Sequence, residues 1–116
     1  AYKDVKLFVN IRRVRESGLL DHLQKELREP LAIFLFGSFA KAENRPGSDV
    51  DLFVLTNTKR SVDVSAFEKV LKAPIQLLIH TPEEVTRLAR KNPNLLNNIL
   101  NGVRLTGFWE VWHKLR

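Results

Sequence analysis

Two aspartates separated by a single residue follow a glycine–serine pair in this chain. Gly37 and Ser38 come directly after an apolar run, and Asp49 and Asp51 follow after ten intervening residues. Because side chains alternate along a strand, the carboxylates of Asp49 and Asp51 are expected to point to one face. Neighbouring carboxylates repel each other unless a cation lies between them, and Mg²⁺ (or Mn²⁺) prefers carboxylate and phosphate oxygens. The pair therefore predicts a metal site that can hold a nucleoside triphosphate.

The residues before the aspartates are suited to phosphate. Gly37 has no side chain and lets a ligand approach the backbone closely. Ser38 is expected to begin a short helix, where free N–H groups favour a phosphate. Lys41 and Arg45 could neutralise a triphosphate, although ordinary surface charge explains them equally well. No Gly-Lys-Ser/Thr sequence follows, which argues against a Walker-type NTPase.

An alternative interpretation of the aspartates is structural, with Asp49 capping a turn and Asp51 exposed on an edge strand. The apolar residues around Asp51, from Val50 to Val54, oppose this alternative. An unpaired buried aspartate would also cost several kcal/mol, about 2–7 for a polar group without a partner. The spacing from Gly37 and Ser38 favours the metal site.

The elements that must position these residues can be predicted from apolar periodicity and from breaking residues. Strands are expected over residues 31–36, 49–55, 75–79 and 103–106. Helices are expected over 2–17, from 19 until Pro30 ends the helix, and over 37–42, 66–71, 81–91, 92–101 and 108–115. The last of these carries Trp109 and Trp112, which are expected to pack on the core.

This order predicts an α+β fold, an α/β two-layer arrangement of a small mixed β-sheet with helices packed mainly on one face. The 116 residues suit a single domain, with N-terminal helices at 1–30, a core at 31–107 and a C-terminal helix at 108–116. The chain lacks an initiator methionine, so it could also be part of a longer protein.

Composition is that of an ordinary globular protein, with 44% hydrophobic and 28% charged residues and no cysteine. No apolar run approaches the roughly 18 residues that span a membrane, and no secretory signal is present. We therefore expect a cytoplasmic protein without a membrane partner. The net charge of +6 makes polyanions plausible partners, and nucleic acid is a weaker candidate than a nucleotide because the charge is spread along the chain.

The Gly37-Ser38 pair and the Asp49-Val50-Asp51 triplet resemble the signature of the DNA polymerase beta-type nucleotidyltransferase superfamily. The small size resembles its minimal nucleotidyltransferase (MNT) branch, and the likeness covers residues 31–107. The resemblance implies a nucleotidyltransferase fold, with Gly37 and Ser38 holding the triphosphate of ATP or another NTP. It also implies that Asp49 and Asp51 bind magnesium and that AMP is transferred to a hydroxyl.

Members of the MNT branch are often antitoxins of HEPN-type toxins, and they can adenylylate a tyrosine of the toxin. The resemblance therefore implies a HEPN-type toxin as a protein partner.

The third carboxylate that active members use has no obvious counterpart here. On the strand over 75–79 the corresponding position is Gln76, interpreted as the polar interior residue of that strand. A neutral amide can neither accept a proton nor neutralise metal charge. Asp63 or Glu83 could substitute for the missing carboxylate, and His80, on the same strand face, could activate an acceptor.

Three functions therefore stay open. The first is a Mg-dependent nucleotidyltransferase. The second is a catalytically weakened NTP-binding regulatory or interaction module. The third is a regulatory domain attached to a DNA-binding segment.

Overall fold

The computed structural model describes residues 1–107, and the predicted C-terminal helix with Trp109 and Trp112 lies outside the described residues. The helices are α1 (Tyr2–Glu16), α2 (Leu19–Glu26), α3 (Gly37–Ala40), α4 (Ser65–Leu71), α5 (Pro82–Lys91) and α6 (Pro93–Leu100). The strands are β1 (Ala32–Phe36), β2 (Val50–Leu55), β3 (Ile75–His80) and β4 (Val103–Gly107). Among the described residues, no helix is long and apolar enough to cross a membrane.

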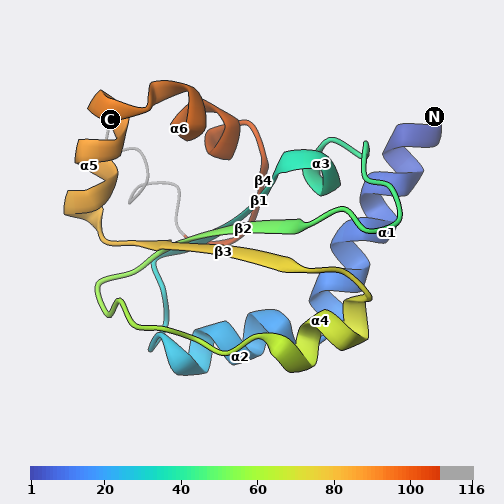
Figure 1. Ribbon diagram of the computed structural model, residues 1–116, viewed down its shortest axis with the longest axis horizontal. Coiled ribbons are helices and arrows are strands. Elements are labelled where there is room, and N and C mark those ends of the chain that lie inside the picture. The colour runs from blue at the N-terminus through green and yellow to red at the C-terminus, as the bar shows by residue number, and fades with distance from the viewer. Residues whose placement is uncertain (108–116) are drawn as a thin grey trace.

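The strands form one mixed sheet in the order β3-β2-β1-β4. β1 is antiparallel to both β2 and β4, whereas β2 and β3 are parallel. Parallel neighbours need a crossover connection, and α4 lies within the one that joins β2 to β3 (Figure 1). The small mixed sheet expected from the sequence is confirmed.

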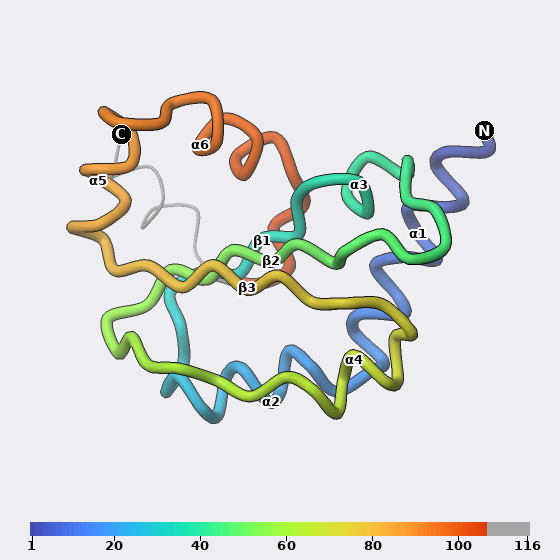
Figure 2. The backbone as a smooth tube through the Cα atoms, in the orientation of Figure 1, coloured from blue at the N-terminus to red at the C-terminus, as the bar shows by residue number. Residues whose placement is uncertain are grey.

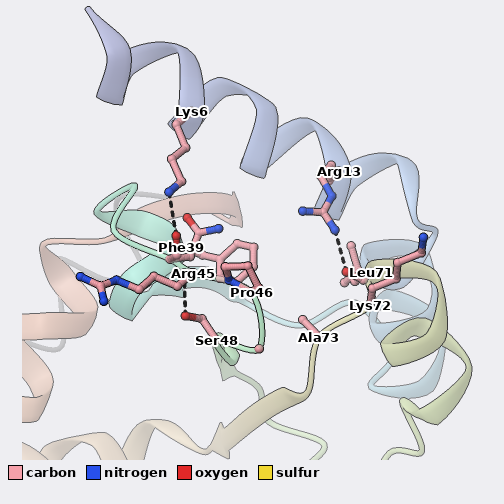
Figure 3. A pocket seen from close by; sticks show the side chains of 11 residues that line it. Lys6, Arg13, Phe39, Arg45, Pro46, Ser48, Leu71, Lys72 and Ala73 are labelled. Carbon is pink, nitrogen blue, oxygen red and sulfur yellow. Dashed lines mark hydrogen bonds between the residues drawn. The ribbon is translucent and has the colours of Figure 1, made fainter.

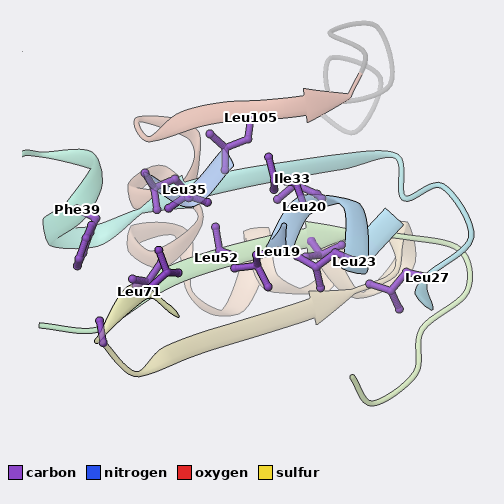
Figure 4. Packing of buried hydrophobic residues seen from close by; sticks show 14 residues of the cluster. Leu19, Leu20, Leu23, Leu27, Ile33, Leu35, Phe39, Leu52, Leu71 and Leu105 are labelled. Atoms are coloured by element: carbon purple, nitrogen blue, oxygen red, sulfur yellow. The ribbon is translucent and has the colours of Figure 1, made fainter. Parts of the chain in front are cut away.

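The larger hydrophobic core lies on the sheet face that α1, α2 and α4 cover. Leucines of α2 pack there against residues such as Ile33 and Leu35 of β1 and Leu52 of β2 (Figure 4). These strand residues alternate with others that point to the opposite face. This face carries the main helical layer that the sequence predicts.

A second, smaller core lies on the opposite face of the sheet. There Val85 of α5 and Ile99 of α6 are buried with Phe34 and Phe53. Figure 1 shows α5 and α6 on this side, opposite α2 and α4. The α+β class is confirmed, and the structure adds a helical layer on the second face because both faces of β1 and β2 are apolar.

Helix boundaries follow local signals in the sequence. Gly18 separates α1 from α2 with a φ of 87°, a backbone conformation that favours glycine. α5 begins with a capping box, in which Thr81 Oγ1 accepts a hydrogen bond from the Glu84 N–H at 3.3 Å. The N–H of Thr81 donates in return to Glu84 Oε1 at 2.9 Å. The helix start predicted at Thr81 is therefore confirmed.

Candidate active site

The turn from β1 into α3 brings the backbone of Gly37 against a side chain of the neighbouring strand. Gly37 has a φ of +72°, and a β-carbon at this position would lie 2.2 Å from Oδ2 of Asp51. Any other residue would therefore be strained and would also displace the carboxylate. Gly37 therefore makes room for Asp51.

Asp51 lies in the middle of a row of residues across the sheet. It pairs with Phe36 of β1 on one side and with Gln76 of β3 on the other. The side chain is half-buried, and its Oδ1 has no hydrogen-bond partner among the described residues. Burial raises the pKa of Asp51 above its ordinary value, and the nearby charge of Asp49 raises this pKa further. The site therefore favours a cation that would compensate this carboxylate.

Asp49 and Ser38 complete the predicted set around Asp51. Asp49 is exposed and directly precedes β2, two positions from Asp51 and therefore on the same face. Ser38 is the second residue of α3 and is half-buried. Figure 2 shows the chain passing from α3 through the 41–49 loop into β2, which lies beside β1. The structure thus brings the segments carrying Gly37, Asp49 and Asp51 together.

The loop that carries Asp49 is held by hydrogen bonds of its own. The N–H of Glu43 donates to the Ser38 carbonyl at 2.8 Å. Further along, Ser48 Oγ accepts from the Arg45 N–H at 2.9 Å, and the N–H of Ser48 donates to the Arg45 carbonyl at 2.9 Å. These bonds fix the end of the loop just before Asp49.

α1 supplies a support for this loop that was not predicted from the sequence. Asn10 is 2% exposed, and its Nδ2 donates to the Phe39 carbonyl at 3.0 Å and to Asn44 Oδ1 at 2.8 Å. Lys6 Nζ donates to the Asn44 carbonyl at 2.7 Å (Figure 3). A signal was present, because Asn10 is a polar residue on the inward face of an amphipathic helix.

The two predicted phosphate-binding cations lie outside the core of the site. Lys41 is exposed and follows the last residue of α3, one turn beyond Ser38. Arg45 is exposed and is among the residues that line a cavity between α1 and the end of α4. Figure 3 shows its side chain directed away from Arg13 and Leu71. Both can reach solvent near the loop, and no ion pair to another described residue holds either one.

Gln76 occupies the register position beside Asp51. The expectation that its side chain is interior was wrong, because Gln76 is exposed. β3 is an edge strand of the sheet, and the apolar run around Gln76 is only half-buried. The open position beside Asp51 therefore carries a neutral amide that faces solvent.

The structure does not place near Asp51 any of the three residues considered in place of a third carboxylate, which are His80, Glu83 and Asp63. His80 pairs with Leu55 at the opposite end of the parallel β2–β3 pair, four positions from Gln76, which is about 13 Å along a strand. Glu83 follows His80 in α5, at that same far end. The proposal that His80 activates an acceptor at Asp51 is therefore not supported by its position.

Asp63 also lies elsewhere in the fold. Its carbonyl is 3.0 Å from His22 Nε2 of α2, on the sheet face opposite α5 and α6. Its carboxylate accepts a hydrogen bond from the N–H of Ser65 at the start of α4. Asp63 is therefore tied to the residues around the start of α4 and does not take the place of the missing carboxylate.

The residues present fit a divalent cation held by two carboxylates. Asp51 offers a buried oxygen without a protein partner among the described residues, and Asp49 places a second carboxylate beside it. Oxygen ligands of this kind suit Mg²⁺ or Mn²⁺, which usually complete their shells with water and substrate phosphates. Among residues 1–107, no third histidine, aspartate or glutamate joins the pair.

Comparison with known proteins identifies the family and the fold. The family model described as "Polymerase beta, Nucleotidyltransferase" matches residues 19–107. A crystal structure of the toxin–antitoxin MntA–HpeT, with two aspartates replaced by glutamate, has a TM-score of 0.58 and 17% identity. A toxin–antitoxin structure with AMP-PNP has a TM-score of 0.56 and 17% identity. Each comparison covers 86% of this chain and 79% of the other.

At this identity the two solved structures show likeness of fold. No curated protein sequence matches the chain at a significant level. The family match spans well over half of the chain and includes Gly37, Ser38 and both aspartates. The chain therefore belongs to the polymerase beta nucleotidyltransferase family.

Proposed function

We propose that this domain is a Mg²⁺-dependent nucleotidyltransferase that transfers AMP from ATP to a hydroxyl group of a protein or small molecule. The observation that carries the proposal is the Asp51 carboxylate, which lies against Gly37 with one oxygen unpartnered among the described residues. A half-buried carboxylate of this kind costs stability in the free protein. Such a cost is expected at a binding site rather than at a structural position.

In this proposal Asp49 and Asp51 hold Mg²⁺ or Mn²⁺, and Gly37 and Ser38 contact the triphosphate. When bound, the metal supplies positive charge that neutralises the phosphates and the departing pyrophosphate. Lys41 and Arg45 are exposed beside the loop and can reorient toward the phosphate tail.

The transfer itself requires an acceptor hydroxyl in line with the α-phosphorus. The acceptor oxygen forms a bond to that phosphorus as the bond to the bridging oxygen of pyrophosphate breaks, and the hydroxyl proton is lost to solvent or to the partner. The exposed position of Gln76 beside Asp51 leaves this side of the site open to an acceptor.

The acceptor that we propose is a tyrosine of a cognate HEPN-type toxin, with this domain as the antitoxin. The two solved structures reported above are toxin–antitoxin structures, and one was solved with the ATP analogue AMP-PNP. A cytoplasmic location belongs to the same proposal, because ATP, Mg²⁺ and such a toxin would meet there.

The test is a labelling assay with α-labelled ATP and Mg²⁺, with and without the protein encoded beside this one. We expect label on the neighbouring protein and release of pyrophosphate, both lost in the Asp49→Asn/Asp51→Asn variant. Label transfer that persists in this variant would remove the two aspartates from the mechanism.

A second function is favoured by one specific observation, the neutral Gln76 at the register position beside Asp51. A domain without a third carboxylate can bind a metal–nucleotide complex yet turn it over slowly, since a general base contributes about 10²–10⁴ in rate. In this alternative the domain is an NTP-binding regulatory or interaction module, attached or not to a DNA-binding segment. Calorimetric binding of ATP and Mg²⁺ without transfer in the labelling assay would select it.

A further inference from the structure

α1 exposes an unusual amount of apolar surface. Of the five large hydrophobic side chains exposed in the described part of the chain, four lie on this helix: Tyr2 (76% exposed), Val5 (64%), Phe8 (63%) and Val9 (44%). Successive residues of a helix rotate by about 100°, which places these four on one outward side, here called the α1 stripe. The opposite side buries Asn10 and Val14. Contiguous apolar surface of this kind usually marks an interaction site.

The C-terminal half of the same outward side is charged. A hollow of about 330 Å³ lies where the two halves meet, and it is lined by Phe8, Ile11, Arg12, Arg15 and Glu16. Arg15 donates to the Leu105 carbonyl at 3.1 Å, while Arg12 pairs with Glu16 at 2.8 Å. The outward side is therefore apolar at its N-terminal half and mainly basic at its C-terminal half.

The helix as a whole carries excess positive charge. Its basic residues are Lys3, Lys6, Arg12, Arg13 and Arg15, and its acidic residues are Asp4 and Glu16. The acidic residue at its C-terminal end, Glu16, is already paired with Arg12. Acidic groups of a partner molecule would therefore complement the basic C-terminal half of α1.

We propose that the α1 stripe and its basic end form a docking surface for an amphipathic helix of a partner protein. Apolar side chains of that helix cover the stripe, one of them enters the hollow beside Phe8, and carboxylates at one end meet Arg12 and Arg15. This is the helix-in-groove mode of recognition, in which apolar anchors repeat every three or four residues. The inference is independent of nucleotide transfer, so either can fail alone.

A second copy of this chain fits the surface poorly. Two α1 helices packed antiparallel would set the apolar half of each against the basic half of the other. Packed parallel, they would set Arg12 and Arg15 against the same residues of the other copy, and like charges in contact are unfavourable. An acidic partner removes both mismatches.

A membrane surface matches the charge but not the shape. A basic helix with an apolar side can lie on anionic lipid. The hollow beside Phe8 and Arg12, however, accepts a protruding side chain, which a partner helix provides and a flat lipid surface does not. The hollow and the separation of apolar from basic halves together favour a protein helix.

The experiment uses a labelled synthetic helix of about 18 residues, five turns, with leucines at positions i, i+3, i+4 and i+7 and glutamates at one end. The comparison probes are the same peptide with lysines in place of glutamates, and phosphatidylglycerol vesicles. Binding to the whole chain is measured by fluorescence anisotropy, vesicle binding by co-sedimentation, and the oligomeric state by sedimentation equilibrium.

We expect saturable binding of the acidic peptide and at least tenfold weaker binding by Val5→Ser and by Phe8→Ser. Arg12→Gln should weaken binding of the acidic peptide and should not weaken binding of the lysine peptide. The matched control is Val70→Ser on α4, which replaces a 61% exposed valine that borders the last turn of α1 but is not part of the α1 stripe, and it should bind like the original chain. Circular dichroism establishes that each variant is folded.

Four outcomes would overturn the proposal. They are equal binding of the lysine peptide, a dimer that Val5→Ser dissociates, binding to vesicles without binding to the acidic peptide, and no binding of the acidic peptide at all.

Discussion

The backbone of Gly37 and the carboxylate of Asp51 leave no space for a side chain between them, since a β-carbon on residue 37 would lie 2.2 Å from Asp51 Oδ2. Gly37 follows β1 and begins α3, while Asp51 lies in β2 beside Phe36. The proposed phosphate contact and the proposed metal ligand are therefore packed directly against each other. A side chain added at position 37 must therefore displace the carboxylate of Asp51.

Gly37→Ala is expected to abolish nucleotide transfer, with a loss of at least about 10² in rate as for other misplaced catalytic groups. The matched control is Gly47→Ala. Gly47 also has a positive φ, +89°, but a β-carbon on this residue would meet no atom within 4 Å. Both variants should lose about 1–2 kcal/mol of stability from the left-handed backbone. Equal activity of the two variants in the labelling assay would contradict a specific role of the Gly37–Asp51 contact.

Asp51→Asn is expected to stabilise the metal-free protein. The pKa of Asp51 is raised by burial and by Asp49, so the folded state binds this proton more tightly than the unfolded state does. The contribution of Asp51 to the free energy of unfolding therefore falls as the pH rises from the ordinary pKa of an aspartate, about 4, through the raised pKa of Asp51. Thermal melts should show a higher melting temperature for Asp51→Asn than for the original chain. The difference should be small in acid and reach its full size at neutral pH.

The control for this prediction is Asp49→Asn. It removes the charge of Asp49, the smaller of the two causes that raise the pKa of Asp51, and should stabilise the protein less than Asp51→Asn does. Added Mg²⁺ with ATP should raise the melting temperature of the original chain and leave that of Asp51→Asn unchanged, since binding to the folded state stabilises it. A loss of stability in Asp51→Asn would indicate a structural role for this carboxylate.

Gln76→Glu is expected to increase nucleotide transfer. The substitution places a carboxylate at the register position beside Asp51. There it can take up the proton of the acceptor hydroxyl and serve as a further metal ligand. A general base contributes about 10²–10⁴ in rate, so a rise of at least tenfold in initial rate is expected. Gln24→Glu on α2 makes the same chemical change on the other face of the sheet and should have no effect. An unchanged rate in Gln76→Glu would show that the missing carboxylate does not limit the reaction.

Glu84→Gln is expected to destabilise the protein at neutral pH but not in strong acid. Hydrogen bonds from Lys59 and from the Thr81 N–H lower the pKa of Glu84 to about 2. A lowered pKa means that Glu84 stabilises the fold above its ordinary pKa and loses this contribution as pH falls toward about 2. Melting curves recorded across this range should converge for the two proteins at the acid end. A constant difference would mean that charge on Glu84 does not matter.

Local signals in the sequence determined much of the site. The apolar run before Gly37, the ten-residue spacing and the Asp49–Asp51 pair predicted a strand, a turn and two carboxylates on one face, because side-chain alternation follows from strand geometry alone. The capping box at Thr81 was predictable for the same reason, since its hydrogen bonds join residues only three positions apart. Assignment of the metal and phosphate roles stays a prediction.

The order of strands and their edges was decided by tertiary structure. The run around Gln76 is apolar like a central strand, yet among the described strands β3 pairs only with β2, and Gln76 is exposed. His80 lies at the other end of this strand pair, beside Leu55. The support of Asn10 for the 41–49 loop and the exposure of the α1 stripe likewise depend on contacts between distant segments. Local sequence specifies which residues share a face, whereas the packing of distant elements decides which faces and edges are buried.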